Sequence, residues 1–452
     1  MQQRFTPRTG RRIAAGIAGA AAAALMLTAC SGDTGSVDVA DEAPDELSGT
    51  VSLWHFFTDR EASVIQGVVD DFEAQNPGVT VEVHEGQDDE KLRKVIAAGS
   101  DDIDVGLSYS TDVVGNLCST GAFRDLQPYI DRDEVDMSQI SDTVQSYSEF
   151  EGTRCTMPVL ADVNALFYNK DIFAEAGITE PPKTLDELED IALKLTEYND
   201  DGSIKRLGFN PFMGMYENTA AHFGPAVGGK WLDDDGYSAI GSDEGWPVLM
   251  QWQKDFVDEI GYDKLQAFTA GLGQEFSADN AFHTGQLAMT IDGEYRTAFI
   301  ADQAPDLNYG TAPFPTATGF EDLYGSGYIV GNIAGIAKGS KNPELAWALL
   351  KYLSTDTDAL VKMGNGLKNV PTTTAALESP DLEVSEQYQT FIDIALHPKT
   401  ATTPPSLVGA GYTQAFGSYW EKFQAGTGGN LAEGLAGVDQ EINDSVDLVS
   451  GP

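Results

Sequence analysis

Basic residues, histidine and cysteine are scarce in this chain. Its 452 residues include 27 Lys and Arg against 71 Asp and Glu, a formal net charge of −44. A surface this negative is repelled by phosphate backbones, which disfavours nucleic-acid binding. The five histidines show no metal-ligand spacing, so no metal site is predicted. The histidines are His55, His84, His222, His283 and His397.

Motifs of catalytic chemistry are missing as well. The sequence has no G-x-S-x-G elbow, P-loop or dinucleotide-binding fingerprint. With 71 acidic residues, a carboxylate pair suited to glycoside hydrolysis would occur by chance. The number of acids is therefore no evidence for catalysis.

The N-terminus has the pattern of an export signal. Four arginines between Arg4 and Arg12 precede the uncharged, apolar run Ile13–Leu27, which is too short to span a bilayer comfortably. The run ends in Leu-Thr-Ala-Cys30, which resembles the lipobox of bacterial lipoproteins. The resemblance implies a signal peptide over residues 1–29 and lipid attachment to Cys30; a plain secretory signal is the alternative. The acidic, small residues 30–48 read as a flexible tether.

The cysteine count agrees with an oxidising compartment. The chain has three cysteines, and lipid attachment to Cys30 would leave the even pair Cys118 and Cys155. We predict a disulfide between them, with two buried free thiols as the alternative.

The body of the chain alternates strand and helix patterns. Residues 50–57, 79–83 and 104–109 read as strands, and apolar residues from Val64 to Phe72 recur at helical spacing between the first two. The pattern restarts after Pro158, with strands over 165–168, 206–209 and 287–291. Helices are expected after the capping box Thr184/Glu187, from Asn342-Pro343, and over 412–423 and 432–449. Alternation of this kind predicts an α/β fold with parallel crossovers, arranged as two similar lobes.

Aromatic and acidic residues follow several predicted strands. Residues 54–57, 109–112 and 292–295 lie where strands end, which is where open α/β sheets bind ligands. Aromatic faces pack on sugar C–H surfaces, while carboxylates and amides bond to hydroxyls. This combination suits a sugar.

The segment Met157–Glu175, with its core Tyr168-Asn169-Lys170, resembles the signature of family 1 extracellular solute-binding proteins, the maltose-binding-protein-like components of ABC importers. Leu160 is a minor departure. The resemblance extends over nearly the whole mature chain, including residues 123–126, 284–289 and 325–327. It implies a type II periplasmic-binding-protein-like fold, two α/β lobes joined by hinge crossovers, with no enzymatic activity and no cofactor. Expected lobe boundaries are 49–160 plus 293–330 and 161–292 plus 331–452.

The same resemblance implies a set of ligand contacts. The family positions fall on Phe56, Thr58, Asp59, Tyr109, Asp112, Asp162, Tyr216, Glu217, Asp292, Tyr295, Gly325, Ser326 and Tyr412, with Lys368-Asn369 as weaker candidates. Each has a structural alternative. Trp54 and Phe57 suit the core, Asp112 could cap a helix, Asp162 could be only a hinge hydrogen-bond partner, and Tyr216 and Tyr295 could be packed in the interior.

The expected function is a binding protein tethered to the outer face of the cell membrane by the lipid on Cys30. It would bind a sugar or oligosaccharide between its lobes, as a monomer, and deliver it to the transmembrane subunits of an ABC permease. The alternatives are a secreted glycosidase and a binding protein for a polyol or ferric iron.

Overall fold

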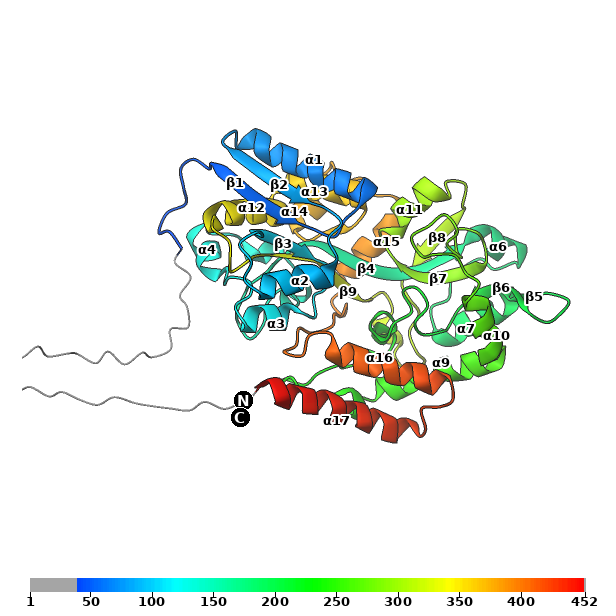
Figure 1. The fold of residues 1–452 in the computed structure, drawn as a ribbon. Coiled ribbons are helices and arrows are strands. Elements are labelled where there is room, and N and C mark those ends of the chain that lie inside the picture. The colour runs from blue at the N-terminus through cyan, green and yellow to red at the C-terminus, as the bar shows by residue number, and fades with distance from the viewer. Residues whose placement is uncertain (1–38, 451–452) are drawn as a thin grey trace, which may run out of the picture. The chain divides into compact units, whose positions relative to one another are not determined.

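The computed structural model describes residues 39–450 (Figure 1). The expected signal peptide, Cys30 and residues 30–38 of the expected tether lie outside the described residues. Residues 39–48 form no helix or strand. Ala40 nevertheless contacts the body, because its N–H donates to Glu344 and its carbonyl accepts from Arg132.

The first half of the sheet is built from the N-terminal strands. Strands β1 (Gly49–Trp54), β2 (Val79–His84) and β3 (Val105–Ser108) are parallel in the order β2-β1-β3, as the alternating pattern predicts. Helix α1 (Asp59–Gln75) connects the first two, and α2 (Asp89–Ala97) the next two. Helix α1 forms because its apolar residues recur on one face, which is buried, and it ends at Asn76, before Pro77.

One long strand connects the two halves. Strand β4 (Met157–Asn169) pairs with β9 (Ile329–Ile336) through Val163, and with β7 (Leu287–Gly293) from Asn164 onward. All of these pairs are antiparallel, as is the pairing of β9 with β3. The parallel crossovers predicted from the sequence therefore hold for the first three strands and not for the centre of the sheet.

The second half of the sheet continues from β7. Strand β6 (Ile204–Phe209) lies parallel to β7, β5 (Glu197–Tyr198) borders β6, and β8 (Tyr309–Ala312) pairs with the end of β4. The short β10 (Val370–Pro371) pairs with residues 160–161 of β4. The molecule is a mixed α/β protein with two lobes, as expected.

Elements that are distant in the sequence pack together in each half of the sheet. Helices α12 (Pro343–Thr355) and α13 (Thr357–Leu367) pack against β1 and α1. Helix α11 (Arg296–Gln303) and β8 come after β7 in the chain, and β8 pairs with the second part of β4. Strand β9 returns to lie between β3 and β4, which brings α12 and α13 back to the N-terminal strands.

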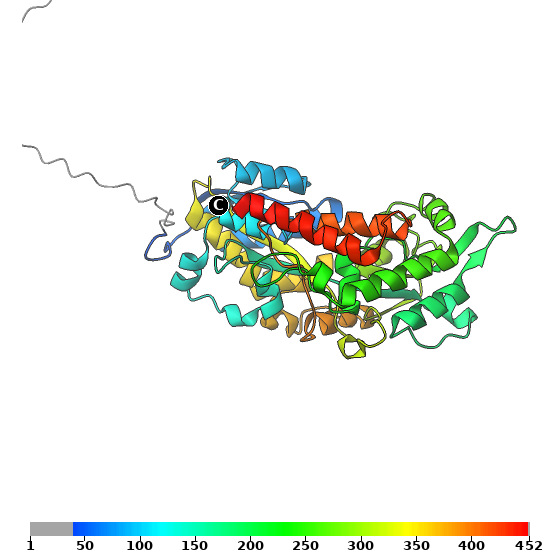
Figure 2. The same cartoon turned by 90° about the horizontal axis from the view of Figure 1, so that it is seen from below.

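The remaining helices cover the sheet and its edges (Figures 1 and 2). In the first half they are α3 (Val114–Ser119), α4 (Gln127–Arg132), α5 (Asp142–Ser146) and α14 (Thr374–Leu377). Elsewhere they are α6 (Lys170–Glu175), α7 (Leu185–Leu195), α8 (Ala220–Phe223), α9 (Gly245–Ile260), α10 (Tyr262–Thr269), α15 (Glu386–Ala395), α16 (Gly411–Gln424) and α17 (Leu431–Ser450). Within the described residues, no helix combines the length and apolarity needed to cross a bilayer.

Two features predicted from the sequence are present. The disulfide joins Cys118 of α3 to Cys155, just before β4. The capping box at the start of α7 is complete, because Thr184 accepts from the Glu187 N–H and Glu187 accepts from the Thr184 N–H.

Aromatic rings pack together in the core of the second half. Trp246 of α9 meets Phe416 of α16 edge to face, with ring centroids 4.9 Å apart, and Trp420 continues the cluster. Trp231 packs edge-on against Trp246. This cluster fixes α16 against α9, so the outer face of α16 can serve as a wall.

A candidate ligand cavity between the two halves of the sheet

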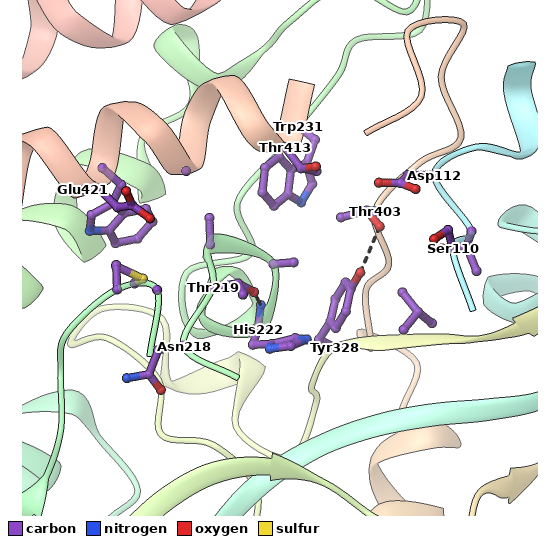
Figure 3. Close-up of a pocket in the computed structure, with 18 of the residues that line it drawn as sticks. Ser110, Asp112, Asn218, Thr219, His222, Trp231, Tyr328, Thr403, Thr413 and Glu421 are labelled. Carbon is purple, nitrogen blue, oxygen red and sulfur yellow. Dashed lines mark hydrogen bonds between the residues drawn. The ribbon is translucent and has the colours of Figure 1, made fainter. Parts of the chain in front are cut away.

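A cavity of about 470 Å³ lies between elements of the two halves (Figure 3). Its volume is in the range of small-molecule sites. One wall follows β3, the opposite wall comes from residues 213–222 and α16, and the start of β9 lies between them. The lining residues are Tyr109, Ser110, Thr111, Asp112, Met213, Gly214, Asn218, Thr219, Ala220, Ala221, His222, Trp231, Tyr328, Val330, Thr403, Thr413, Gly417, Trp420 and Glu421.

The first wall is the turn between β3 and α3. Tyr109 follows the last residue of the strand, and its side chain is 53% exposed. The ring of Phe56, after β1, meets the Tyr109 ring edge to face at 5.0 Å. Asp112 comes from the same turn and points into the cavity region in Figure 3. Tyr109 and Asp112 therefore lie at the carboxyl end of a strand, where the sequence analysis predicted a ligand site.

A glycine lets the loop at residues 403–406 approach this wall. A Cβ on Gly115, in α3, would lie 2.4 Å from the carbonyl oxygen of Ser406. Thr403 of that loop shares a hydrogen bond of 2.9 Å with the Tyr328 hydroxyl, which is drawn in Figure 3. The glycine therefore allows the loop to lie against α3 and to complete the cavity.

The opposite wall is held by side-chain amides. The Asn218 Nδ2 donates to the carbonyl oxygens of Asn210 and Phe212, at 2.6 and 3.1 Å. The Met213 N–H donates to Gln424 of α16 at 2.9 Å. These bonds fix the loop before α8, and α8 then presents His222 to the cavity.

His222 is connected to residues behind the cavity. Its Nδ1 lies 3.2 Å from Glu217 Oε2, and the Tyr295 hydroxyl donates to Glu217 Oε1 at 2.9 Å. Burial acts to raise the pKa of Glu217, but His222 and the donors around the carboxylate outweigh it and hold that pKa below its usual value.

Three carboxyl groups meet behind this pair. Oxygens of Glu217, Glu275 and Asp292 lie within 4.8 Å of one another, and Arg296 Nε donates to Asp292 at 2.7 Å. Burial and the neighbouring acids raise the pKa of Glu275 to about 9. Burial, opposed by Arg296, raises the pKa of Asp292 to about 6. Three acids face one guanidinium here, so Glu275 keeps a proton at neutral pH.

A second group of polar side chains lies where β4 changes partners. The Asn369 amide nitrogen donates both to Asp162 and, at 3.0 Å, to Glu294 Oε1. Asn332 of β9 donates to Asp162 at 3.2 Å, and Glu294 Oε2 accepts the Val163 N–H at 2.6 Å. Burial raises the pKa of Asp162 to about 7 and that of Glu294 well above its usual range, the latter helped by the Asp162 charge.

The predicted ligand contacts are spread over several places. Among them, Tyr109 and Asp112 line the cavity, and Phe56 contacts Tyr109. Thr58 and Asp59 are exposed at the start of α1. Tyr216 donates its hydroxyl to the Gly273 carbonyl at 2.7 Å. Glu217, Asp162 and Tyr295 belong to the polar groups described above.

The other predicted contacts are turned inward. Asp292 is buried and bonded to Arg296, and Ser326 is buried with its hydroxyl on the Leu323 carbonyl. Tyr412 is fully buried, donates to the Pro404 carbonyl and packs against Trp231. Gly325 has a φ of 102°, which suits its turn. None of these four residues reaches the cavity in this conformation.

Several lining residues were not found from the sequence. They are His222, Trp231, Tyr328, Thr403, Trp420 and Glu421, with the smaller residues around them. His222 follows the helix cap Thr219, whose hydroxyl accepts the His222 N–H, but a cap of this kind carries no ligand signal. These residues share only their position around the cavity, which forms when elements distant in the sequence pack together.

Comparisons with known proteins agree with this architecture. The family model described as bacterial extracellular solute-binding protein matches residues 58–359. A binding protein of Brucella abortus is 28% identical over 291 residues, covering 62% of this chain and 66% of that protein. The match thus spans just under two thirds of that relative's length. A maltotriose-binding protein of Pyrococcus abyssi is 23% identical over 337 residues, covering 74% of this chain and 69% of that protein.

The fold is also that of a solved structure. The sugar-binding protein MalE of Xanthomonas citri superposes with a TM-score of 0.70 at 23% identity, covering 88% of this chain and 97% of that one. The family match covers more than half of the sequence and includes α1, β4 and β9. This chain belongs to the family of bacterial extracellular solute-binding proteins.

Proposed function

We propose that this protein binds a sugar or oligosaccharide in the cavity between its lobes and delivers it unchanged to an ABC permease. The observation that carries this is the lining of the cavity. It combines aromatic rings of Tyr109, Trp231 and Tyr328 with several hydroxyls and amides. Rings pack on the C–H faces of pyranoses, and hydroxyls and amides exchange hydrogen bonds with sugar hydroxyls.

The charge of the cavity supports an uncharged ligand. Asp112 and Glu421 are acidic, and neither lysine nor arginine occurs among the described lining residues. A phosphate or carboxylate group would meet like charge here without a compensating partner, which is costly in a site shielded from water. Carboxylates are instead good acceptors for neutral hydroxyls.

The position of the cavity supports capture by closure. Its walls belong to elements on either side of the point where β4 changes partners, and β9 begins at that point, so the segment leading into β9 is a second connection. Bending there would move one wall toward the other, which is the hinge motion of two-lobed binding proteins. Closure removes water, so each sugar hydroxyl needs a partner in the walls.

Relatives support the ligand class. The Pyrococcus relative is a maltotriose-binding protein, and the Xanthomonas structure is a sugar-binding protein. By the same reasoning we propose residues 1–29 as an export signal, Cys30 as the lipid-bearing residue, and a monomer held at the outer face of the membrane. The predicted contacts Phe56, Thr58, Asp59 and Asp162 remain proposals for the closed form.

The test is a ligand screen on the purified protein. A ligand that binds only the folded chain raises its melting temperature, so a panel of neutral mono- and oligosaccharides should contain at least one that does so. Calorimetry then gives the affinity, and chromatography of the recovered sugar should show it intact. Failure of every sugar to bind, or release of shorter sugars, would contradict the proposal.

A further inference from the structure

His222 has one ring nitrogen turned to acceptors. Its Nδ1 lies close to the carbonyl oxygen of Glu217 and 3.2 Å from Glu217 Oε2. Neither oxygen can donate a hydrogen bond when the carboxylate is ionised, so Nδ1 must carry a hydrogen. In a neutral imidazole the hydrogen on Nδ1 leaves Nε2 with a lone pair, and Nε2 is on the opposite edge of the ring.

Glu217 is held in place from behind. Its Oε1 accepts the Tyr295 hydroxyl at 2.9 Å, so both carboxylate oxygens are engaged. Next to it, Glu275 keeps a proton while Asp292 is bonded to Arg296. These neighbours favour the ionised form of Glu217, because the nearby proton is already on another carboxyl group.

The ring of His222 faces the cavity from a fixed orientation. His222 is a lining residue, its side chain is 12% exposed, and its ring centroid is 5.0 Å from that of Tyr328 (Figure 3). The Tyr328 hydroxyl is bonded to Thr403, and Glu217 is not among the lining residues. Of these groups, the His222 ring edge is the one presented to a ligand.

We propose that His222 determines specificity in this cavity by offering Nε2 as an acceptor for a ligand hydroxyl, and that Glu217 and Tyr295 are positioning residues that set its tautomer and orientation. The proposal takes the cavity as the ligand site and so rests on the proposed function. It differs from the sequence-based expectation, in which Glu217 itself contacts the ligand. The protein would bind a ligand with a hydroxyl group next to Nε2 more tightly than a ligand with an ether oxygen or no oxygen at that position.

The tautomer can be measured without a ligand. The full chain, labelled with ¹⁵N-histidine, gives long-range ¹H–¹⁵N correlations, and His222→Gln assigns the signal. We expect the Nδ1–H form for His222. Either the Nε2–H form or the doubly protonated ring as the major species would overturn the proposal, whether or not any sugar binds, because neither leaves a lone pair on Nε2. This separates its failure from a failure of the proposed function.

The role in binding is tested with a matched pair of variants. Maltotriose, mannobiose and diacetylchitobiose serve as probes in calorimetry. His222→Leu removes the acceptor and should weaken binding of any probe that the wild type binds by about tenfold, the cost of a lost hydrogen bond. His222→Gln places an amide near the position of Nε2 and should restore much of that loss. Equal affinity of the Leu variant and the wild type would overturn the proposal.

A double-mutant cycle distinguishes positioning from contact. Glu217→Gln should weaken binding in the wild type and have little further effect in the His222→Leu background, because it acts through the imidazole. Additive losses would instead mean that Glu217 contacts the ligand itself. Thermal unfolding of each variant shows whether it folds. If a variant folds poorly, the tautomer of His222 in the wild type still tests the proposal.

Discussion

Val163 and Asn164 are adjacent in the chain but belong to different ladders. Val163 pairs with Ile329 of β9, and Asn164 pairs with Gly293 of β7. The peptide between them is therefore the point at which β4 passes from one half of the sheet to the other. The polar group formed by Asp162, Glu294 and Asn369 surrounds this point, so the protonation of its carboxyls acts where the lobes are joined.

The first prediction concerns pH and this polar group. Burial raises the pKa of Asp162 to about 7, far above that of an aspartate in an unfolded chain. Between about pH 4 and 7 the folded state keeps a proton that the unfolded state has lost, so this group's contribution to stability falls as pH rises. Asp162→Asn removes the titration while its amide can still face Asn369 and Glu294.

We expect the Asp162→Asn variant to lose less stability between pH 5 and 8 than the wild type, by about 2–3 kcal/mol. Urea unfolding at the two pH values measures the difference. Asp200→Asn, in an exposed turn, is the matched control and should leave the profile as it is. Parallel profiles for the Asp162 variant and the wild type would show that Asp162 does not titrate in this range.

The second prediction concerns the aromatic wall. Tyr109 is 53% exposed and lines the cavity, so Tyr109→Ala removes a stacking surface with little loss of core packing. Sugar affinity should fall about tenfold, the order expected for an aromatic contact, while the melting temperature changes little. Tyr198 is 46% exposed on β5 and does not line the cavity, so Tyr198→Ala should leave affinity unchanged. If the two variants changed sugar affinity equally, the ligand would not bind against Tyr109.

Local patterns predicted many of the elements. Helix α1 follows from its apolar periodicity, α7 from its capping box, and β1 to β3 from their alternation with helices. The disulfide follows from counting cysteines. The bounds of β4 were harder to predict, because Met157–Asn169 is almost entirely buried on both faces, polar residues such as Asn164 included, and so shows no sustained alternation of apolar and polar residues.

The long-range pairing could not be predicted in this way. Strand β9 inserts between β3 and β4 although it lies more than a hundred residues away in sequence, and no local signal specifies such a partner. The cavity shows the same limit. Tyr109 and Asp112 were predicted because they end a strand, whereas His222 and Glu421 come from helices whose relative placement is set by packing.

The third prediction concerns the bond between Cys118 and Cys155. The bond closes a loop with a sequence separation of 37 residues, which in the chain-entropy model stabilises the fold by about 4 kcal/mol. Cys118→Ser/Cys155→Ser should therefore unfold at clearly lower urea concentration than the oxidised wild type. Reduced wild type should behave like the double variant, which checks that the serines themselves add no defect. Coincident curves for all three proteins would mean that the bond contributes nothing to stability.

The last prediction compares two helical glycines. Gly417 in α16 lines the cavity and Gly437 in α17 does not, and a Cβ at either position would meet no atom within 4 Å. Replacing either by alanine removes backbone freedom from the unfolded chain and should raise stability by about 0.5–1 kcal/mol. The Gly417 methyl group would enter the space that we assign to the ligand, so Gly417→Ala alone should lower sugar affinity. If both variants were more stable than the wild type and both bound the sugar with unchanged affinity, the ligand would not reach α16.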